Sequence, residues 1–144
     1  MLLVAASRLG DGLLWVAIAL TIPLLGGPQG VPCAIQMAGV GAVNLALYAL
    51  LKRCIGRARP FVACAGIRAC ARALDQYSFP SGHTLHAVAF ATLLSWHYPV
   101  FAVPLWIFAA LVMASRVVLG LHYPSDVAVG AIIGAATATI ALSI

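Results

Sequence analysis

Three long stretches of this chain contain no charged side chain. They are residues 12–51, 76–115 and 127–144, and together they make up most of the 144 residues. A helix needs roughly 20 apolar residues to cross the hydrocarbon core of a bilayer, which is about 30 Å thick. Charged residues are only 8% of the sequence and hydrophobic residues 64%, far from the averages of soluble domains. The chain is therefore predicted to be an integral membrane protein rather than a small soluble helical domain.

Glycine and proline residues divide these stretches into separate helices. The predicted fold class is an all-α polytopic membrane helical bundle with about five transmembrane helices, built as a single domain over residues 1–144. In the last helix, Gly130-x-x-x-Gly134 predicts that a neighbouring helix of the same chain approaches closely. The five helices are expected near residues 12–26, 33–51, 83–97, 99–117 and 126–143.

All the charge of the chain is expected at one membrane surface. Five crossings place residues 1–11, 52–82 and 116–125 on the same side, and all 8 basic and all 3 acidic residues lie in these segments or at the helix ends that adjoin them. The excess of basic residues in loops at the cytoplasmic side of membrane proteins assigns this surface to the cytoplasm. The first residues have no cleavage-site pattern, so no removable signal peptide is predicted.

The charged surface carries three short polar motifs. They read Lys52-x6-Arg59-Pro60, Pro80-Ser81-Gly82-His83 and Ser115-Arg116-x5-His122-x3-Asp126. In the third motif, Asp126 follows His122 by four residues, which allows its carboxylate to accept a hydrogen bond from Nδ1–H of His122. That bond would leave Nε2 of His122 unprotonated and available as a nucleophile. On its own, however, this pair reads equally well as a helix cap beside an interfacial histidine.

The second motif opens a helix. Ser81 is expected at the N-cap, and Gly82 allows a ligand to approach the backbone closely. The free N–H groups at a helix start bind an oxyanion well. His83, on the first turn, is placed to protonate a departing alkoxide, because imidazole titrates near neutral pH.

Positive charge is the third component of the set. Lys52 and Arg59 flank the end of the second predicted helix, and Arg116 ends the fourth. Fixed cations stabilise the charge that spreads over the oxygens of a transferring phosphoryl group. Arg59 is expected to be extended because a proline follows it. The other four arginines of this region need no role in the site, because long basic side chains commonly extend from helix ends to the membrane interface. They are Arg53, Arg57, Arg68 and Arg72.

The complete set resembles the signature of the phosphatidic acid phosphatase type 2 (PAP2) superfamily of membrane lipid phosphatases. That signature is K-x6-RP, PSGH and SR-x5-H-x3-D, and it spans residues 52–126 here. The resemblance implies a metal-independent reaction through a phosphohistidine. In that reaction His122 attacks phosphorus, and Asp126 orients the His122 side chain. His83 would protonate the leaving group and then activate water. The phosphoryl oxygens would be held by Lys52, Arg59, Ser81, Gly82 and Arg116.

The chain departs from this family in two respects. Many members have six helices where five are predicted here, and many work at the periplasmic face, whereas the charge count favours the cytoplasm. The loop over residues 61–79 is also short, so few side chains are available to recognise a head group. Candidates for that recognition are Arg68, Arg72, Asp75, Gln76 and Tyr77, each of which is interpreted equally well as a solvated loop residue. His86, one turn beyond His83, could support the site from behind, but a packed or interfacial histidine is the favoured interpretation.

The predicted function is hydrolysis of a lipid phosphate or diphosphate in a bacterial inner membrane. Candidate substrates are a polyprenyl phosphate or diphosphate, a phosphorylated sugar on a polyprenyl carrier, and phosphatidylglycerol phosphate or phosphatidate. Two alternatives are a haloperoxidase-like oxidase that holds vanadate and a non-catalytic binder of phospholipid head groups. No cofactor, metal or nucleic-acid partner is expected, and Cys64 and Cys70 are expected to be free thiols rather than a disulfide.

Overall fold

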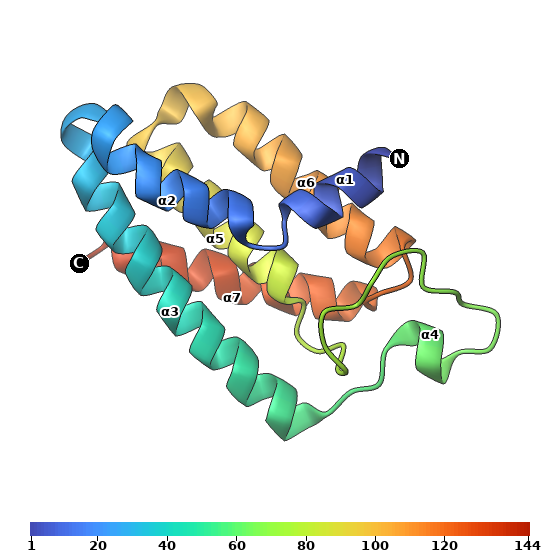
Figure 1. Ribbon diagram of the computed structural model, residues 1–144. Helices are drawn as coiled ribbons and strands as arrows, with labels where there is room; N and C mark the ends of the chain where they lie inside the picture. Colours follow the sequence, from blue (N-terminus) through green and yellow to red (C-terminus); the bar gives the residue numbers. More distant parts are fainter.

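The computed structural model describes residues 1–144, and it contains helices and loops but no strands. The all-α bundle predicted from the uncharged stretches is confirmed (Figure 1). The helices are α1 (Leu2–Leu9), α2 (Leu13–Leu25), η1 (Gly27–Gln29), α3 (Gly30–Ile55), α4 (Pro60–Ala63), α5 (Gly82–His97), η2 (Pro99–Phe101), α6 (Ala102–Val118) and α7 (Pro124–Leu142).

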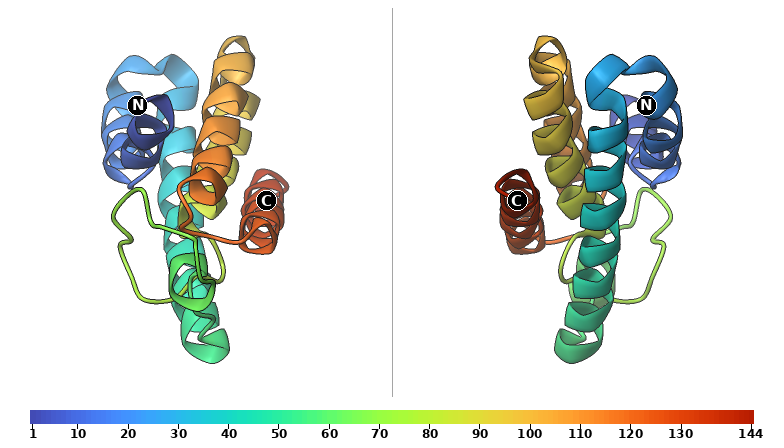
Figure 2. Two further views of the ribbon diagram at one scale, coloured as in Figure 1. Left: turned by 90° about the vertical axis from the view of Figure 1, so that its right-hand side faces the viewer. Right: turned by 90° about the vertical axis from the view of Figure 1, so that its left-hand side faces the viewer.

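Helix α5 lies at the centre of the bundle, where it packs against α3, α6 and α7 (Figure 2). Nine of its residues are buried, most of them alanine, valine or leucine. Contact with α7 is close because a Cβ atom at Gly130 would lie 2.7 Å from the carbonyl oxygen of Ser81. At Gly134, a Cβ atom would lie 2.3 Å from the carbonyl oxygen of Leu85. The two glycines therefore serve packing within the chain.

Three helical segments are long and apolar enough to cross a membrane by themselves: Gly27–Ile55, Pro99–Val118 and Pro124–Leu142. The pair α1 and α2 would make a fourth if its 56° bend is part of one span. Helix α5, at 16 residues, is shorter than a full crossing. Helix α5 packs against α3, α6 and α7 and begins at Gly82 of the second motif. The arrangement of five helical segments is therefore compatible with a multi-pass membrane protein.

Helix α1 was not expected from the sequence. The chain forms a helix from Leu2, stops at Gly10, and turns through an elbow of residues 10–12 into α2. Gly12 has φ 107°, a conformation that residues with a side chain rarely adopt, so the turn depends on glycine there. Because α1 packs on α6, the elbow is held across the bundle rather than extending from it.

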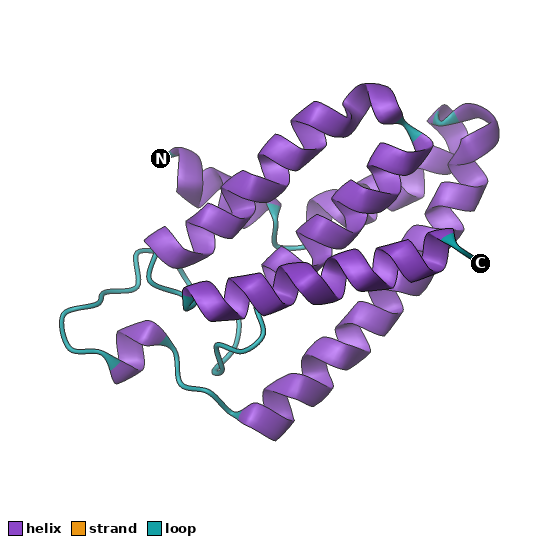
Figure 3. Ribbon diagram, turned by 180° about the vertical axis from the view of Figure 1, so that it is seen from behind, coloured by secondary structure: helices purple, strands orange, loops and turns teal.

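The loops that carry the polar motifs gather at one end of the bundle, and the C-terminus lies at the other (Figure 3). The longest loop connects α4 to α5, and Tyr77 in it pairs with Ala58 in an isolated antiparallel bridge. This pairing brings the chain back beside the end of α3. The end of α3, the start of α5 and the connection from α6 to α7 are therefore neighbours in space.

Candidate active site

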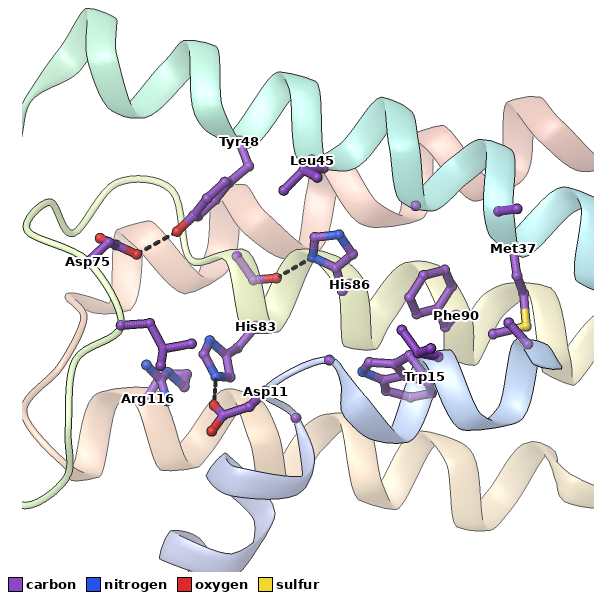
Figure 4. A pocket seen from close by; sticks show the side chains of 18 of the residues that line it. Asp11, Trp15, Met37, Leu45, Tyr48, Asp75, His83, His86, Phe90 and Arg116 are labelled. Carbon is purple, nitrogen blue, oxygen red and sulfur yellow. Dashed lines mark hydrogen bonds and ion pairs between the residues drawn. The ribbon is translucent and has the colours of Figure 1, made fainter. Parts of the chain in front are cut away.

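The three polar motifs meet around one cavity at the loop end of the bundle. The cavity has a volume of about 510 Å³. Five of the eight residues predicted for the site line it, and the other three lie behind these, within the walls. The five that line it are Arg59, Gly82, His83, Arg116 and His122. His83 and Arg116 are labelled in Figure 4.

His122 is held in one tautomer, although its partner differs from the one expected. Its Nδ1–H donates to the carbonyl oxygen of Ser78 at 2.6 Å, whereas the nearest carboxylate oxygen of Asp126 is 3.7 Å away. The expectation of a direct hydrogen bond from His122 to Asp126 is therefore wrong. A carbonyl oxygen can only accept, so Nδ1 keeps its proton and Nε2 is unprotonated, with its lone pair available to accept from Nη1 of Arg59.

The environment of His122 favours the neutral imidazole. Burial lowers the pKa of His122, and the positive charges of Arg59, Arg116 and Lys52 lower it further, against the opposing effect of Asp126. Nε2 lies 3.3 Å from Nη1 of Arg59. A neutral nitrogen beside a fixed guanidinium is the form that can attack an electrophilic phosphorus.

The turn after α6 explains the spacing between Arg116 and His122. The N–H groups of Leu121 and His122 both donate to the carbonyl oxygen of Arg116, at 3.1 and 3.0 Å. The chain reverses at Gly120, which has φ 71° and whose Cβ would lie 2.7 Å from the carbonyl oxygen of Arg68. A helix end followed by this turn returns His122 to the side of Arg116.

Asp126 has a structural position at the start of α7. Its Oδ2 accepts from the N–H of Tyr123 at 2.9 Å, as part of a capping box, and its Oδ1 pairs with Arg57 at 2.8 Å. Arg57, which was expected only to reach the interface from a helix end, also lies over the Tyr123 ring. Asp126 is fully buried, so it fixes the segment that carries His122 and adds negative charge behind it.

Arg116 is the clearest sign that the cavity receives an anion. Its side chain is almost completely buried, Nη1 donates to Oγ of Ser7 at 2.5 Å, and Nε has no hydrogen-bond partner. No carboxylate pairs with this guanidinium. A buried cation with an unused donor is costly unless a ligand satisfies it, and a phosphate group has the charge and acceptors to do so.

Lys52 and Arg59 share a carboxylate that the sequence did not place. Oδ1 of Asp75 lies 2.5 Å from Nζ of Lys52 and 3.0 Å from Nη2 of Arg59, while Tyr48 donates to Oδ2. Burial raises the pKa of Asp75, but hydrogen bonds from Lys52 and Tyr48 and the two cations outweigh it, so the pKa is lowered. Lys52 donates to Asp75, which lines the cavity, and to the carbonyl oxygen of Tyr77, but Lys52 itself does not line it.

Arg59 ties the loops together. It is extended, with φ −73° and ψ 154°, as the following Pro60 predicts. Nε donates to the carbonyl oxygen of Asp75 at 3.0 Å and Nη1 to that of Leu121 at 2.8 Å. The guanidinium therefore lies between the long loop and the turn that carries His122, where it can reach a phosphoryl oxygen.

Ser81 and Gly82 start α5 beside this cluster. Ser81 is the N-cap residue, but its side chain caps no backbone N–H; Oγ lies 3.0 Å from Oγ1 of Thr84. The Ser81 side chain is buried and does not line the cavity. Gly82 does line it, and a Cβ there would lie 2.6 Å from the Tyr48 ring. Glycine is thus needed for the contact between α5 and α3.

His83 has a carboxylate partner that no motif predicted. Its Nε2 lies 2.5 Å from Oδ1 of Asp11 in the elbow between α1 and α2 (Figure 4). The one sequence signal available was composition, because Asp11 is among only three acidic residues and falls on the charged surface. All three acidic residues of the chain contact side chains of the predicted set.

The cavity continues from this polar end into the apolar interior. Its far part lies between α2, α3 and α5 and is lined by Trp15, Leu20, Met37, Leu45 and Phe90 (Figure 4). Helix α3 is long and apolar enough to cross a membrane, and α2 makes such a span together with α1, so the apolar part lies among candidate membrane helices. A ligand that fits the whole cavity has an anionic group at one end and a hydrocarbon chain at the other.

His86 lies on the cavity wall between the polar and apolar parts, rather than packed away from it. Its Nδ1 bonds to the carbonyl oxygen of Gly82 at 2.9 Å, and its ring lies against Phe90. Elsewhere, all four cysteines are free thiols, including Cys64 and Cys70. No group of three or more His, Cys, Asp or Glu side chains has the arrangement of a metal site.

Comparison with known proteins finds the family whose signature the three motifs resemble. The family model of the PAP2 superfamily matches residues 34–144. Decaprenylphosphoryl-5-phosphoribose phosphatase of Mycobacterium tuberculosis is 38% identical over 110 residues, which are 75% of this chain and 59% of that protein. Lipid A 1-phosphatase of Rhizobium johnstonii is 38% identical over 96 residues, covering 60% of this chain and 37% of that protein.

Two solved structures share the fold. LpxE of Aquifex aeolicus superposes with a TM-score of 0.87 at 26% identity, covering 99% of this chain and 84% of that one. The transmembrane PAP2-type phosphatidylglycerolphosphate phosphatase of Bacillus subtilis gives 0.78 at 24% identity, covering 98% and 73%. This chain therefore spans 59% and 37% of the lengths of the two curated relatives. Nearly all of its own length superposes on the two membrane phosphatase structures. With the family match extending over most of its residues, the chain belongs to the PAP2 superfamily.

Proposed function

We propose that this protein is an integral-membrane phosphatase that removes phosphate from a lipid phosphate or diphosphate through a phosphohistidine. One observation carries the proposal: the buried, unpaired guanidinium of Arg116 and the two histidines lie at the end of a cavity whose other end is apolar and membrane-embedded. A phosphate on a lipid satisfies both ends at once. A non-catalytic head-group binder would need the cations but neither histidine.

The geometry supports a two-step displacement. Nε2 of His122 attacks phosphorus while Arg59 and Arg116 stabilise the charge on the phosphoryl oxygens. His83 gives a proton to the leaving oxygen. In the second step His83 takes a proton from water, which attacks the phosphohistidine and releases inorganic phosphate.

The other predicted residues support this centre from behind. Asp126 anchors the start of α7 next to His122. Lys52 is held by Asp75, 2.5 Å away, and places positive charge near the phosphoryl group without lining the cavity. Ser81 contributes through the backbone, since its N–H donates to the carbonyl oxygen of Asp126 at 3.1 Å and joins the second motif to the third.

The relatives narrow the choice of lipid to test first. The two curated relatives are a decaprenylphosphoryl-5-phosphoribose phosphatase and a lipid A 1-phosphatase. The apolar part of the cavity, between α2 and α3, suits a long chain of either type. A phosphorylated sugar on a polyprenyl carrier is therefore the first candidate, before polyprenyl phosphates and diphosphates, phosphatidylglycerol phosphate and phosphatidate.

Phosphate release from this panel of lipids in detergent tests the proposal. We expect release from at least one lipid phosphate, and we expect it to persist in EDTA, because the steps above use only side chains of the chain. An inactive protein that still binds the lipids in a flotation assay would support the non-catalytic binder instead. Bromide oxidation on addition of vanadate, without phosphate release, would support the oxidase.

The orientation in the membrane follows from charges that the site does not use. Arg8, Arg53, Arg68 and Arg72 are exposed, form no ion pair and lie at the loop end, while the opposite loops have no basic residue. On the positive-inside rule, we infer a site at the cytoplasmic face and a C-terminus across the inner membrane. A reporter enzyme that works only outside the cytoplasm is expected to be active when it is fused after Ile144. Activity of a cytoplasmic reporter there would instead place the site in the periplasm.

A further inference from the structure

Asp11 and His83 form a close contact between two parts of the chain that are far apart in sequence. Oδ1 of Asp11 lies 2.5 Å from Nε2 of His83. The side chain of His83 is 10% exposed and that of Asp11 is 39% exposed, so the pair lies at the wall of the cavity with the carboxylate on its outer side. Both residues line the cavity (Figure 4). The family match begins at residue 34, so Asp11 belongs to a part of the chain that it does not cover.

The fold holds Asp11 in this place from both sides. Gly12 turns the chain with φ 107°, and Gly10 packs so closely that a Cβ there would lie 3.3 Å from the Val112 side chain. On α1, Ser7 accepts a hydrogen bond from Arg116. The elbow is therefore fixed against α6, and the position of the Asp11 carboxylate depends on packed groups rather than on a free loop.

The charges around His83 explain what a carboxylate does there. Arg116 on α6 lies beside His83 (Figure 4), and a positive Arg116 disfavours a second cation nearby. His122, in the turn after α6, lines the same cavity. A histidine that gives a proton to a leaving group must carry that proton first. Asp11 is the carboxylate in contact with His83. The remaining titratable groups that line the cavity or support it are His86 on α5, Tyr48 and Lys52 on α3, and Arg59 and Asp75 in the loops.

We propose that Asp11 is a positioning residue that holds His83 with Nδ1 toward the phosphate and stabilises its protonated form. This inference rests on the proposed function, because it assigns Asp11 a part in the proton transfers of that reaction. The active centre then contains two histidines with separate supports: His122 on the Ser78 carbonyl and His83 on the Asp11 carboxylate.

The proton transfers balance over the two steps. In the first, the bond from Nε2 of His122 to phosphorus forms, the bond from phosphorus to the leaving oxygen breaks, and the Nδ1 proton of His83 moves to that oxygen. In the second, water forms a bond to phosphorus, the phosphorus–nitrogen bond breaks, and a proton of the water moves to Nδ1 of His83. Throughout, Nε2–H of His83 stays hydrogen-bonded to Asp11, so no other acid or base is required.

Substrates that differ only in their leaving group test this inference. An alkyl phosphate needs a proton on its leaving oxygen, whereas a nitrophenyl phosphate with an alkyl tail of matched length does not. In Asp11→Asn, which keeps the size of the side chain and removes its charge, we expect phosphoenzyme formation from the alkyl phosphate to slow by about 10²-fold, the lower end of the range for acid catalysis. The burst of nitrophenolate from the aryl substrate should keep its wild-type rate.

The burst amplitude counts active sites, so both rates are expressed per folded enzyme and a partly unfolded variant does not distort their ratio. Arg8→Gln is the matched control, since Arg8 is an exposed charge on the same N-terminal segment with no partner, and both of its rates should equal those of wild type. Equal slowing with both substrates in Asp11→Asn would mean that Asp11 only stabilises the elbow. Equal wild-type rates with both would mean that it does nothing for His83, and either result overturns the inference.

A parallel His83→Ala variant separates the inference from the function on which it rests. The proposed function requires this variant to lose turnover of the alkyl phosphate. If His83→Ala is inactive while Asp11→Asn turns over the alkyl phosphate at the wild-type rate, the inference about Asp11 is wrong and the proposed function stands. If His83→Ala keeps full activity, the assignment of His83 in the proposed function is wrong, and the role of Asp11 is overturned with it.

Discussion

Replacing His122 with alanine is expected to reduce lipid phosphate hydrolysis by on the order of 10⁴-fold or more, as loss of a covalent nucleophile does in other hydrolases. The reason lies in the geometry around the imidazole. Nδ1–H is committed to the Ser78 carbonyl at 2.6 Å, and Nε2 faces the cavity beside Arg59 and Arg116. No other neutral nitrogen in the chain combines a fixed tautomer with two neighbouring guanidinium groups.

A histidine at the other end of the bundle provides the control for this variant. His97 ends α5 and bonds to Gln29 and Gln36, away from the cavity. His97→Ala should retain activity close to wild type, measured as inorganic phosphate released from detergent-solubilised lipid phosphate. Hydrolysis by His122→Ala at a rate near that of wild type would end the proposed nucleophilic mechanism.

The second large effect is expected at Arg116. Arg116→Met keeps most of the volume and removes the charge, and we expect it to reduce activity by about 10²- to 10³-fold, which is typical for loss of one preorganised donor to a developing oxyanion. The same change should not lower the thermal stability of the substrate-free enzyme. In that state the guanidinium is buried without a carboxylate partner and with Nε unsatisfied, and removal of such a charge relieves its desolvation cost.

Thermal unfolding with and without inorganic phosphate measures both parts of this prediction. Wild type should be stabilised by phosphate, because a ligand that binds only the folded state raises the unfolding temperature, and Arg116→Met should lose that response. Arg53→Met serves as control, since Arg53 is an exposed cation at the end of α3 that does not line the cavity. An Arg116 variant that is active and still responds to phosphate would show that the anion binds elsewhere.

The fold could be predicted because it depends on the membrane environment, which requires long uncharged helices, and on the glycine and proline residues at their ends. Absence of charge over 12–51, 76–115 and 127–144 defined membrane helices, and glycine and proline defined most of their ends. Helix α1 escaped prediction because its eight residues are too few for a span, and it is held by packing on α6 rather than by its own sequence pattern.

The convergence of the three motifs could be expected from the sequence, but their individual contacts could not. The motifs lie at helix ends on one predicted surface and match one family signature, and five of the eight residues line the same cavity. The partners of these side chains come from tertiary structure: Asp11 lies 72 residues from His83, and Asp75 lies 23 residues from Lys52. His122 illustrates the limit, because a four-residue spacing favoured Asp126, whereas the long loop brought the Ser78 carbonyl closer.

The central claim is that phosphate passes through a covalent bond to His122, and trapping that bond tests it most directly. In His83→Ala, a radiolabelled nitrophenyl phosphate should still phosphorylate the enzyme, because its leaving group needs no proton, while hydrolysis of the intermediate is slow without the base. We expect a burst of one nitrophenolate per active site and an acid-labile, alkali-stable label on the peptide that contains His122. A label on any other residue, or steady turnover in this variant with no labelled enzyme, would contradict the account.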